Sequence, residues 1–369
     1  MQTTGLLEAM ADGIGEVTFA SAEWIELAGE VFAEEVSRRR GALADLSSFA
    51  LCEVAHNPPA YLRSEGPLAW HARLESGHVT VGIGEIPDSE CTFKLQGDHS
   101  IMSNLARVPY RGRSADTVAA TRKRLLALSR WKRRGEMPAH PALTESLSAL
   151  HDALAPRTMP RLVFMTPEWV SIARHFLTTR ARSKKYAPGI QYVRYTFAEE
   201  FTDTPLYAFP DASHGGFWVR CDRGEFVVEA GPLPDSFAPA DHLTLGSYAA
   251  VVPVGRTVER AMTEDDRALR DAYVKTAFRY DKVTKRAPVS QSSPSGRGEM
   301  PAPLARIFLP LHDEMSKRTS GELPSDFGDT IRAEWATPQA FDRRPSYEPA
   351  WLRYGEVDIF GQPRRSRRR

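Results

Sequence analysis

The hydrophobic positions of this chain follow a pattern that occurs twice. Residues 19–32 (FASAEWIELAGEVF) place Trp, Ile, Ala, Val and Phe side chains on one face at helical spacing. Residues 164–177 (FMTPEWVSIARHFL) repeat this pattern 145 residues later. Ser21 in the first segment, and Thr166 followed by Pro167 in the second, are residues that favour the start of a helix. We therefore predict an amphipathic helix at the start of each of two similar units.

Alternation of apolar and polar residues predicts a hairpin after each helix. In the first unit, residues 70–75 and 79–83 alternate on either side of a Ser-Gly turn. In the second unit, residues 217–221 and 226–230 alternate around an Asp-Arg-Gly turn. This period of two predicts half-buried strands in both places.

Further elements are expected around the first hairpin. Strands are predicted near residues 49–54 and 91–95. Asp98 is placed to cap a short helix, and a longer helix is predicted over residues 115–131. In the second unit, a helix over residues 247–254 takes the place of the short one. Each unit therefore combines helices with a mainly antiparallel sheet.

Short motifs recur in the same order along the chain and indicate a tandem duplication. GEIPDS at residues 84–89 matches GPLPDS at 231–236, and RGEMPA at 134–139 returns at 297–302. The added length in the second copy falls near residues 288–298, which are rich in Ser, Gly and Pro. The predicted division is 1–17 lead-in, 18–135 first module, 136–163 appendage or linker, 164–286 second module, 287–320 linker and repeated appendage, and 321–369 extended C-terminal arm.

Composition and charge are those of an ordinary globular protein and exclude few functions. The formal net charge of +1 gives no overall field that would favour nucleic acid or acidic lipid. No apolar run reaches the length of a transmembrane segment, and the first residues lack the features of a secretory signal. Three cysteines without a C-x-x-C pair are typical of reduced thiols, so a cytoplasmic location is expected.

The C-terminal arm ends in a cluster of basic residues. It comprises Arg364, Arg365, Arg367, Arg368 and Arg369. Such a tip suits a weak contact with an anionic surface, or it is a solvated tail. The second interpretation is favoured because no other positive cluster is evident in the chain.

The order of motifs resembles the sterol-carrier-protein family. The residues that carry the resemblance are WHARLESGHVTVGIGEIPDS (70–89) with GDHSIMSNLAR (97–107), and FWVRCDRGEFVVEAGPLPDS (217–236) with GSYAAVVPVGR (246–256). The resemblance covers about 115 residues of each copy. It implies an α+β fold of two tandem sterol-carrier-like modules, each a mainly antiparallel twisted sheet covered by helices. It also implies an apolar tunnel for lipids, sterols or acyl chains.

The same resemblance implies which residues bind the ligand. The helix over the tunnel would contribute Trp24, Ile25, Ala28 and Phe32 in the first module and Trp169, Val170, Ala173 and Leu177 in the second. The floor would include Val79, Val81, Phe226 and Val228. The alternative interpretation is that the two tryptophans are anchors of the hydrophobic core.

Candidate catalytic residues are few. The chain lacks a dinucleotide fingerprint, a P-loop, an H-E-x-x-H motif and a G-x-S-x-G motif, so no cofactor or metal is expected. Glu53 and Glu200, 147 residues apart on predicted strands, are candidates for a general acid or base if they face an apolar cavity. If they face solvent, they are ordinary strand residues. His99 is a candidate polar group at the tunnel mouth, although Tyr248 takes its place in the second copy.

His151 and Asp152 are adjacent on a predicted helix and recur as His312 and Asp313. Adjacent helical residues point in different directions, so these are interpreted as surface polar residues.

The favoured function is the binding and transfer of a hydrophobic small molecule without catalysis. An enzyme acting on a lipid-, sterol- or polyketide-like substrate in the same tunnel is the alternative, and a protein-interaction scaffold is the third. The sequence does not specify the ligand, the role of the arm or the oligomeric state.

Overall fold

The computed structural model describes residues 10, 13–46, 48–62, 64–126, 131–202, 215–238, 240–248, 290–292 and 300–320, with single positions at 252, 255, 256, 258, 264, 267 and 268. The described chain forms two compact units, one within residues 1–161 and one within residues 162–321. The predicted arm and its five arginines lie outside the described residues. So do most of the predicted 247–254 helix and most of the Ser-rich linker.

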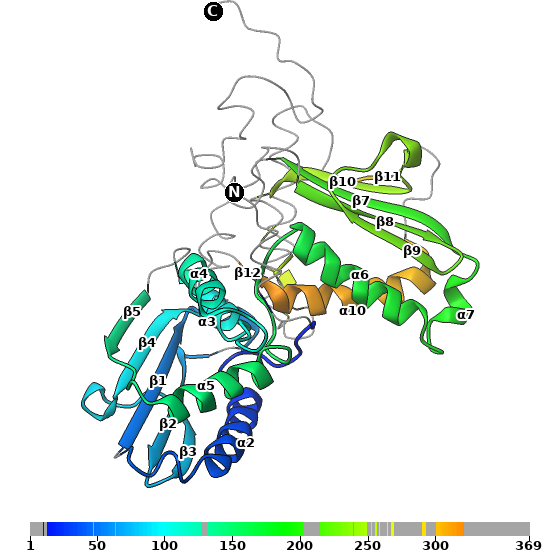
Figure 1. The fold of residues 1–369 in the computed structure, drawn as a ribbon. Helices are drawn as coiled ribbons and strands as arrows, with labels where there is room; N and C mark the ends of the chain where they lie inside the picture. The colour runs from blue at the N-terminus through cyan, green and yellow to red at the C-terminus, as the bar shows by residue number, and fades with distance from the viewer. Residues whose placement is uncertain are drawn as a thin grey trace, which may run out of the picture. The chain divides into compact units, whose positions relative to one another are not determined.

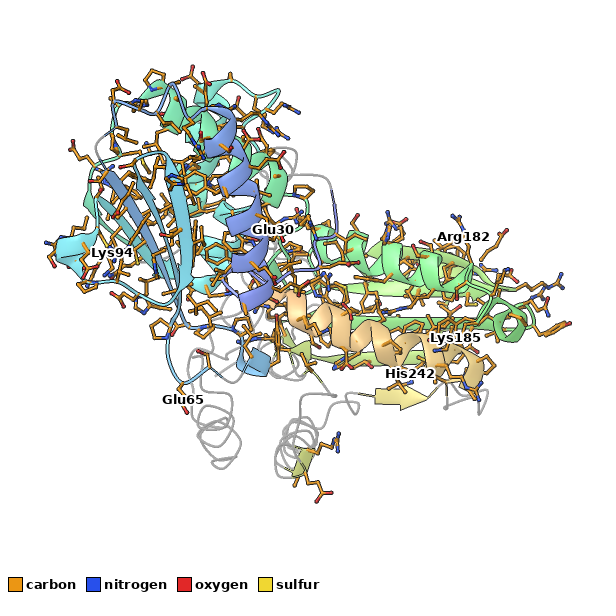
Figure 2. All side chains as sticks on the ribbon, turned by 90° about the horizontal axis from the view of Figure 1, so that it is seen from below. Glu30, Glu65, Lys94, Arg182, Lys185 and His242 are labelled. Carbon is orange, nitrogen blue, oxygen red and sulfur yellow. The ribbon has the colours of Figure 1, made fainter. Side chains whose placement is uncertain are left out.

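The first unit begins with helix α2 (Ala22–Arg38), as the sequence predicts. The Ser21 hydroxyl accepts a hydrogen bond from the Trp24 amide at 3.3 Å and so caps the helix. The inner face of α2 is buried, whereas Glu30 on the outer face is exposed (Figure 2). Burying each large apolar side chain of this face contributes roughly 1.5–3 kcal/mol.

A five-stranded sheet forms the body of the first unit. Its strands are β1 (Ser48–His56), β2 (Leu68–Glu75), β3 (His78–Ile83), β4 (Phe93–Asp98) and β5 (Trp131–Gly135), in the order β3-β2-β1-β4-β5. Only the β1–β4 pair in this sheet is parallel. Short 3₁₀ turns, η1 (Ala60–Leu62) and η2 (Asp88–Glu90), lie in the connections. The predicted α+β class and the mainly antiparallel sheet are confirmed.

Strand β5 differs from the expected helix over residues 115–131. The helix α4 (Ala115–Leu126) ends earlier, and residues 131–135 pair with β4. Residues 131–135 (WKRRG) show no alternation of apolar and polar positions, because all five residues are exposed at the edge of the sheet. Pairing with a neighbouring strand, which local sequence does not encode, decides its conformation.

Helices α2 and α4 and two further helices, described next, cover one face of this sheet (Figure 1). Asp98 caps α3 (His99–Leu105) by accepting the Ser100 amide at 2.9 Å, as predicted. The helix α5 (Pro141–Leu154) packs against α2 and adds leucines to the same core. Residues 136–161, most of the segment expected as an appendage or linker, belong to the first compact unit.

The two faces of the sheet bury different sets of residues. On β1, Phe49, Leu51 and Ala55 belong to the core under the helices. Cys52 and Val54 alternate with them and pack on the other face. Lys94 lies on that other face, away from α2 (Figure 2).

The second unit contains a sheet of the same strand order. Its strands are β7 (Arg194–Thr202), β8 (Gly215–Asp222), β9 (Glu225–Ala230), β10 (His242–Ser247) and β11 (Ser290–Ser292), arranged β9-β8-β7-β10-β11, with β10 parallel to β7. The other elements are β6 (Leu162–Val163), α6 (Pro167–Ala181), α7 (Ala187–Ile190), η3 (Asp235–Phe237), α10 (Ala302–Arg318) and β12 (Thr319–Ser320). Thr166 caps α6 by accepting the Trp169 amide at 3.4 Å. Helices α6 and α10 pack on each other, as α2 and α5 do (Figure 1).

One buried hydrogen bond occurs in both units. The Trp24 indole Nε1 donates to Thr158 Oγ1 at 2.9 Å, and the Trp169 Nε1 donates to Thr319 Oγ1 at 2.9 Å. In each unit the bond joins the opening helix to a threonine shortly after the helix that packs on it: Thr158 lies four residues beyond the end of α5, and Thr319 directly follows α10. None of the helices in the described part of the chain has the length and apolar character needed to cross a bilayer.

Candidate functional site

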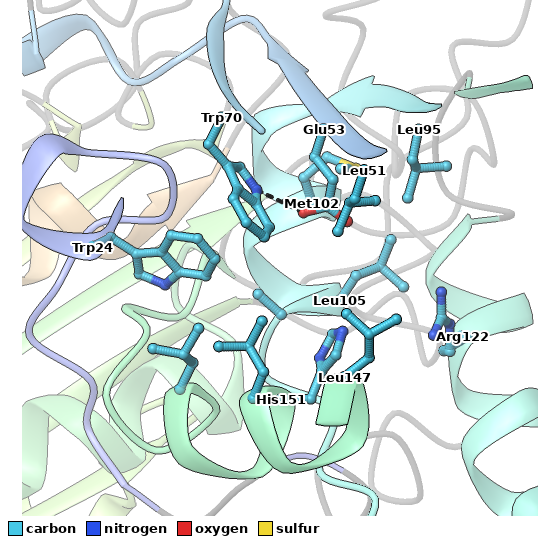
Figure 3. A pocket seen from close by; sticks show the side chains of 13 residues that line it. Trp24, Leu51, Glu53, Trp70, Leu95, Met102, Leu105, Arg122, Leu147 and His151 are labelled. Atoms are coloured by element: carbon cyan, nitrogen blue, oxygen red, sulfur yellow. Dashed lines mark hydrogen bonds between the residues drawn. The ribbon is translucent and has the colours of Figure 1, made fainter. Parts of the chain in front are cut away.

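A cavity of about 40 Å³ lies in the first unit, between the sheet and helices α3, α4 and α5 (Figure 3). Its walls are mostly apolar. They are formed by Trp24, Leu51, Trp70, Leu95, Met102, Leu105, Ala106, Leu147, Leu150 and Leu154. Three ionisable residues, Glu53, Arg122 and His151, complete the lining.

The cavity is smaller than a ligand site. One water molecule needs about 10–15 Å³ of cavity volume measured in the same way, so this cavity holds roughly three water molecules. Pockets that enclose a small organic ligand measure roughly 300–1,000 Å³. The conformation described is therefore closed, and the predicted apolar tunnel stays a prediction.

Glu53 reaches the cavity from the inner face of β1. The Trp70 indole Nε1, on the neighbouring strand, donates to Glu53 Oε2 at 2.9 Å. The second oxygen, Oε1, has no hydrogen-bond partner among the described residues. Burial raises the pKa of Glu53, and the Trp70 hydrogen bond and the charge of Arg122 offset part of that rise. Glu53 is thus a carboxyl group held in place through one oxygen, while the other makes no hydrogen bond within the described residues.

His151 reaches the cavity from the opposite side, on α5 (Figure 3). Its ring packs on Tyr110 with centroids 5.1 Å apart, and its Nδ1 is buried without a partner in the described chain. Burial and the charge of Arg122 lower its pKa to about 3, so the imidazole is neutral near pH 7. The sequence interpretation of His151 as a surface residue is wrong. Residues 147, 150, 151 and 154 share one face of α5, and this spacing could have revealed it.

Arg122 on α4 lines both the cavity and a neighbouring groove. Its guanidinium donates to the Tyr110 hydroxyl. The groove is open, measures about 730 Å³ and runs along α4 and α5. Trp131, 42% exposed, lies in this groove. The cavity and the groove therefore share the Arg122 side chain.

In the second unit, the strand register identifies Glu199, not Glu200, as the counterpart of Glu53. Glu53 pairs with Trp70, and Glu199 pairs with Phe217. Trp70 and Phe217 correspond, because each lies seven residues before the glycine of its hairpin turn, Gly77 or Gly224. Burial raises the pKa of Glu199 to about 7. Glu200 lies on the other face of the sheet and accepts the Leu233 amide at 2.9 Å. Counting 147 residues from Glu53 therefore gave the wrong residue.

His99 is not at the mouth of the cavity. It is 1% exposed, and its Nε2 is 3.1 Å from the Phe19 carbonyl oxygen. In the second unit, the Tyr248 hydroxyl donates to the Phe164 carbonyl at 3.0 Å. The two different side chains therefore make the same tether to the start of their units, which explains the replacement noted in the sequence.

Most residues predicted to contact a ligand pack in the two hydrophobic cores. Trp24 lines the cavity and is also a buried anchor, so its two interpretations are compatible. The others do not line the cavity, and their contact with a ligand stays a prediction. They are Ile25, Ala28, Phe32, Val79 and Val81 in the first unit, and Trp169, Val170, Ala173, Leu177, Phe226 and Val228 in the second.

Comparison with known proteins gives no matching family model and no match among curated proteins. Two solved structures match. A conserved hypothetical protein from Thermus thermophilus, described as possibly a sterol carrier protein, is 14% identical with a TM-score of 0.27, over 41% of this chain and 96% of that one. The crystal structure of sterol carrier protein 2 is 16% identical with a TM-score of 0.26, over 37% of this chain and 97% of that one. Scores this low carry no argument about function. Over about two fifths of its length the chain is similar to sterol-carrier-like structures, as its motifs predict.

Proposed function

We propose that the first unit binds a small, largely apolar molecule between its sheet and helices α3, α4 and α5. The observation that carries this proposal is an apolar cavity into which polar atoms point without partners. His151 Nδ1 is buried without a partner, and Glu53 Oε1 has no hydrogen-bond partner among the described residues. A buried polar atom left unpaired costs roughly 1–3 kcal/mol, which a ligand with a matching polar group would recover.

Binding requires the cavity to widen from its closed volume of about 40 Å³. The groove along α4 supports a route of access, because Arg122 lines both spaces. A ligand that buries about 250 Å² of apolar surface gains roughly 6 kcal/mol from that burial. The costs of opening and of immobilising the ligand reduce this gain. Lipids, sterols and acyl chains have the apolar surface that this requires.

We treat the second unit as a tandem copy of the first. The shared strand order, the two Trp–Thr hydrogen bonds and the glutamates at matching register positions support this proposal. The copies differ at the glutamate. Trp70 donates to Glu53, but its counterpart Phe217 has no polar hydrogen to offer Glu199. Binding is therefore proposed first for the unit that keeps the indole.

Native mass spectrometry of the full chain from its own host, followed by organic extraction, tests the proposal. The expected result is a stoichiometric small-molecule adduct. Ala106 lines the cavity, so Ala106→Leu fills it and removes the adduct. Ala120 is exposed on α4, so Ala120→Leu is the matched control and retains the adduct. A bare mass, unchanged after incubation with fatty acids and sterols, contradicts the proposal. So does equal loss of the adduct in both variants.

A further inference from the structure

The polar lining of the cavity consists of three side chains from three different elements. Glu53 comes from β1, Arg122 from α4 and His151 from α5, and all other lining residues are apolar or aromatic. Figure 3 shows Glu53 and His151 entering the same space from the sheet and from the helix side. The charge of Arg122 acts on both of the other groups. A purely passive apolar cavity has no need of such a cluster.

We propose that this cluster is an acid–base site, in which Glu53 removes a proton from the carbon next to a ketone carbonyl while His151 donates a hydrogen bond to the carbonyl oxygen. The substrate class is a ketone or related carbonyl compound on an apolar body. This inference rests on the proposed binding function, since the substrate occupies the same cavity.

The surroundings of Glu53 suit a general base. The Trp70 indole fixes the carboxylate through Oε2 and leaves Oε1 directed to the cavity without a partner in the described structure. Apolar walls raise the pKa of the carboxyl group, and a base of higher pKa accepts a proton from carbon more readily. General base catalysis by such a group typically contributes 10²–10⁴-fold to a rate.

The surroundings of His151 suit an electrophile. Burial and Arg122 keep the ring neutral, with a pKa of about 3, so one nitrogen carries a hydrogen and the other does not. No hydrogen bond to either ring nitrogen is present in the described part of the chain, and the Tyr110 ring holds the imidazole by packing. A neutral imidazole polarises a carbonyl by donating its N–H, as known isomerases do.

The proposed step needs no oxidant or second substrate. The C–H bond next to the carbonyl breaks, and its electron pair forms the carbon–carbon double bond of an enolate. The carbonyl π pair moves to oxygen, which His151 stabilises, and the proton moves to Glu53. Return of the proton to the same carbon exchanges hydrogen, whereas return to a conjugated carbon isomerises the substrate.

Hydrogen exchange of acetone and cyclohexanone in D₂O, followed by NMR, tests this inference on the full chain. Wild-type protein is expected to speed deuterium uptake into at least one ketone beside the carbonyl. Glu53→Gln keeps an acceptor for Trp70 but lacks the base, so the protein-dependent rate falls on the order of 100-fold. Glu75 is exposed at the end of β2, and Glu75→Gln is the matched control with an unchanged rate.

A second variant tests the role of His151 separately. His151→Phe preserves ring packing on Tyr110 and removes the N–H donor, so the exchange rate falls by about tenfold or more. If wild type and Glu53→Gln exchange both ketones at the same rate, the inference is overturned. An adduct in native mass spectrometry together with that result leaves the binding proposal standing. Absence of the adduct, as well as of exchange, overturns both.

Discussion

Replacing Glu199 by glutamine gives the sharpest test of how the second sheet places its carboxylates. Burial raises the pKa of Glu199 to about 7 from its ordinary value of 4.5. The folded chain therefore holds this proton over a pH range in which the unfolded chain has lost it. The contribution to stability is fully present below pH 4.5 and is lost as the pH rises through about 7. One pKa unit corresponds to about 1.4 kcal/mol, so the loss amounts to about 3 kcal/mol.

Glutamine has nearly the shape of protonated glutamate but cannot ionise. We expect Glu199→Gln to match wild type at pH 4 and to be more stable at pH 8, by up to about 3 kcal/mol. Amide hydrogen exchange of the full chain, read by mass spectrometry on peptides from β7 and β8, reports this unit separately from the other. Exchange rates are corrected for the intrinsic effect of pH.

Glu200→Gln is the matched control. Glu200 lies on the opposite face of the same strand, where its carboxylate accepts the Leu233 amide. Replacing a charged acceptor by a neutral one weakens that bond, so this variant is expected to lose about 1 kcal/mol at pH 8. The reasoning is refuted if Glu199→Gln gains no stability at pH 8, or if Glu200→Gln gains as much.

Three further predictions concern the first unit. Thr158→Val removes the hydroxyl that accepts the hydrogen bond of the buried Trp24 indole, so the free energy of unfolding measured in urea should fall by about 1–3 kcal/mol. Thr158→Ser keeps a hydroxyl and should lower it less. Equal losses in the two variants would contradict the hydrogen-bond assignment. The buried ammonium of Lys94 forms ion pairs with Glu85 at 2.5 Å and with Asp88 at 2.6 Å, and Lys94→Met removes both. Calorimetry should therefore show a lower melting temperature for this variant. An unchanged melting temperature would mean that the ion pairs add nothing to stability. The pKa of His99 is lowered to about 3 by burial and by the charge of Arg161, so stability is lost as the pH falls below 6.5. In His99→Gln, the stability of α3 measured by amide hydrogen exchange should fall less steeply as the pH drops below 6.5. A pH dependence equal to that of wild type would refute this prediction.

The sequence predicted the elements with strong local signals. The opening helices have caps and an apolar face, and both hairpins alternate with a period of two, so their formation depends on nearby residues. Strand β5 has no such signal because it forms at an exposed edge by pairing with β4. Its charged residues looked like the continuation of α4.

The candidate site was only partly predictable. Glu53 was identified as a candidate, but its counterpart was assigned by counting residues. A shift of one position moves a strand residue to the opposite face of the sheet, and only the pairing with Phe217 resolves it. His151 was interpreted as a surface residue because it and Asp152, as adjacent helical residues, point in different directions. In the structure Asp152 accepts the Tyr110 amide at 2.6 Å, and His151 turns inward.

The central claim is that a small molecule enters the space between the first sheet and its helices. Nuclear Overhauser effects measured on the full chain with labelled Met and Leu methyl groups, in the presence of cyclohexanone, test it most directly. We predict contacts from the ring protons of the ketone to the methyl groups of Met102, Leu147 and Leu154, which line the cavity. Contacts confined to an exposed methyl group such as that of Leu309, or no contacts at all, would contradict the account.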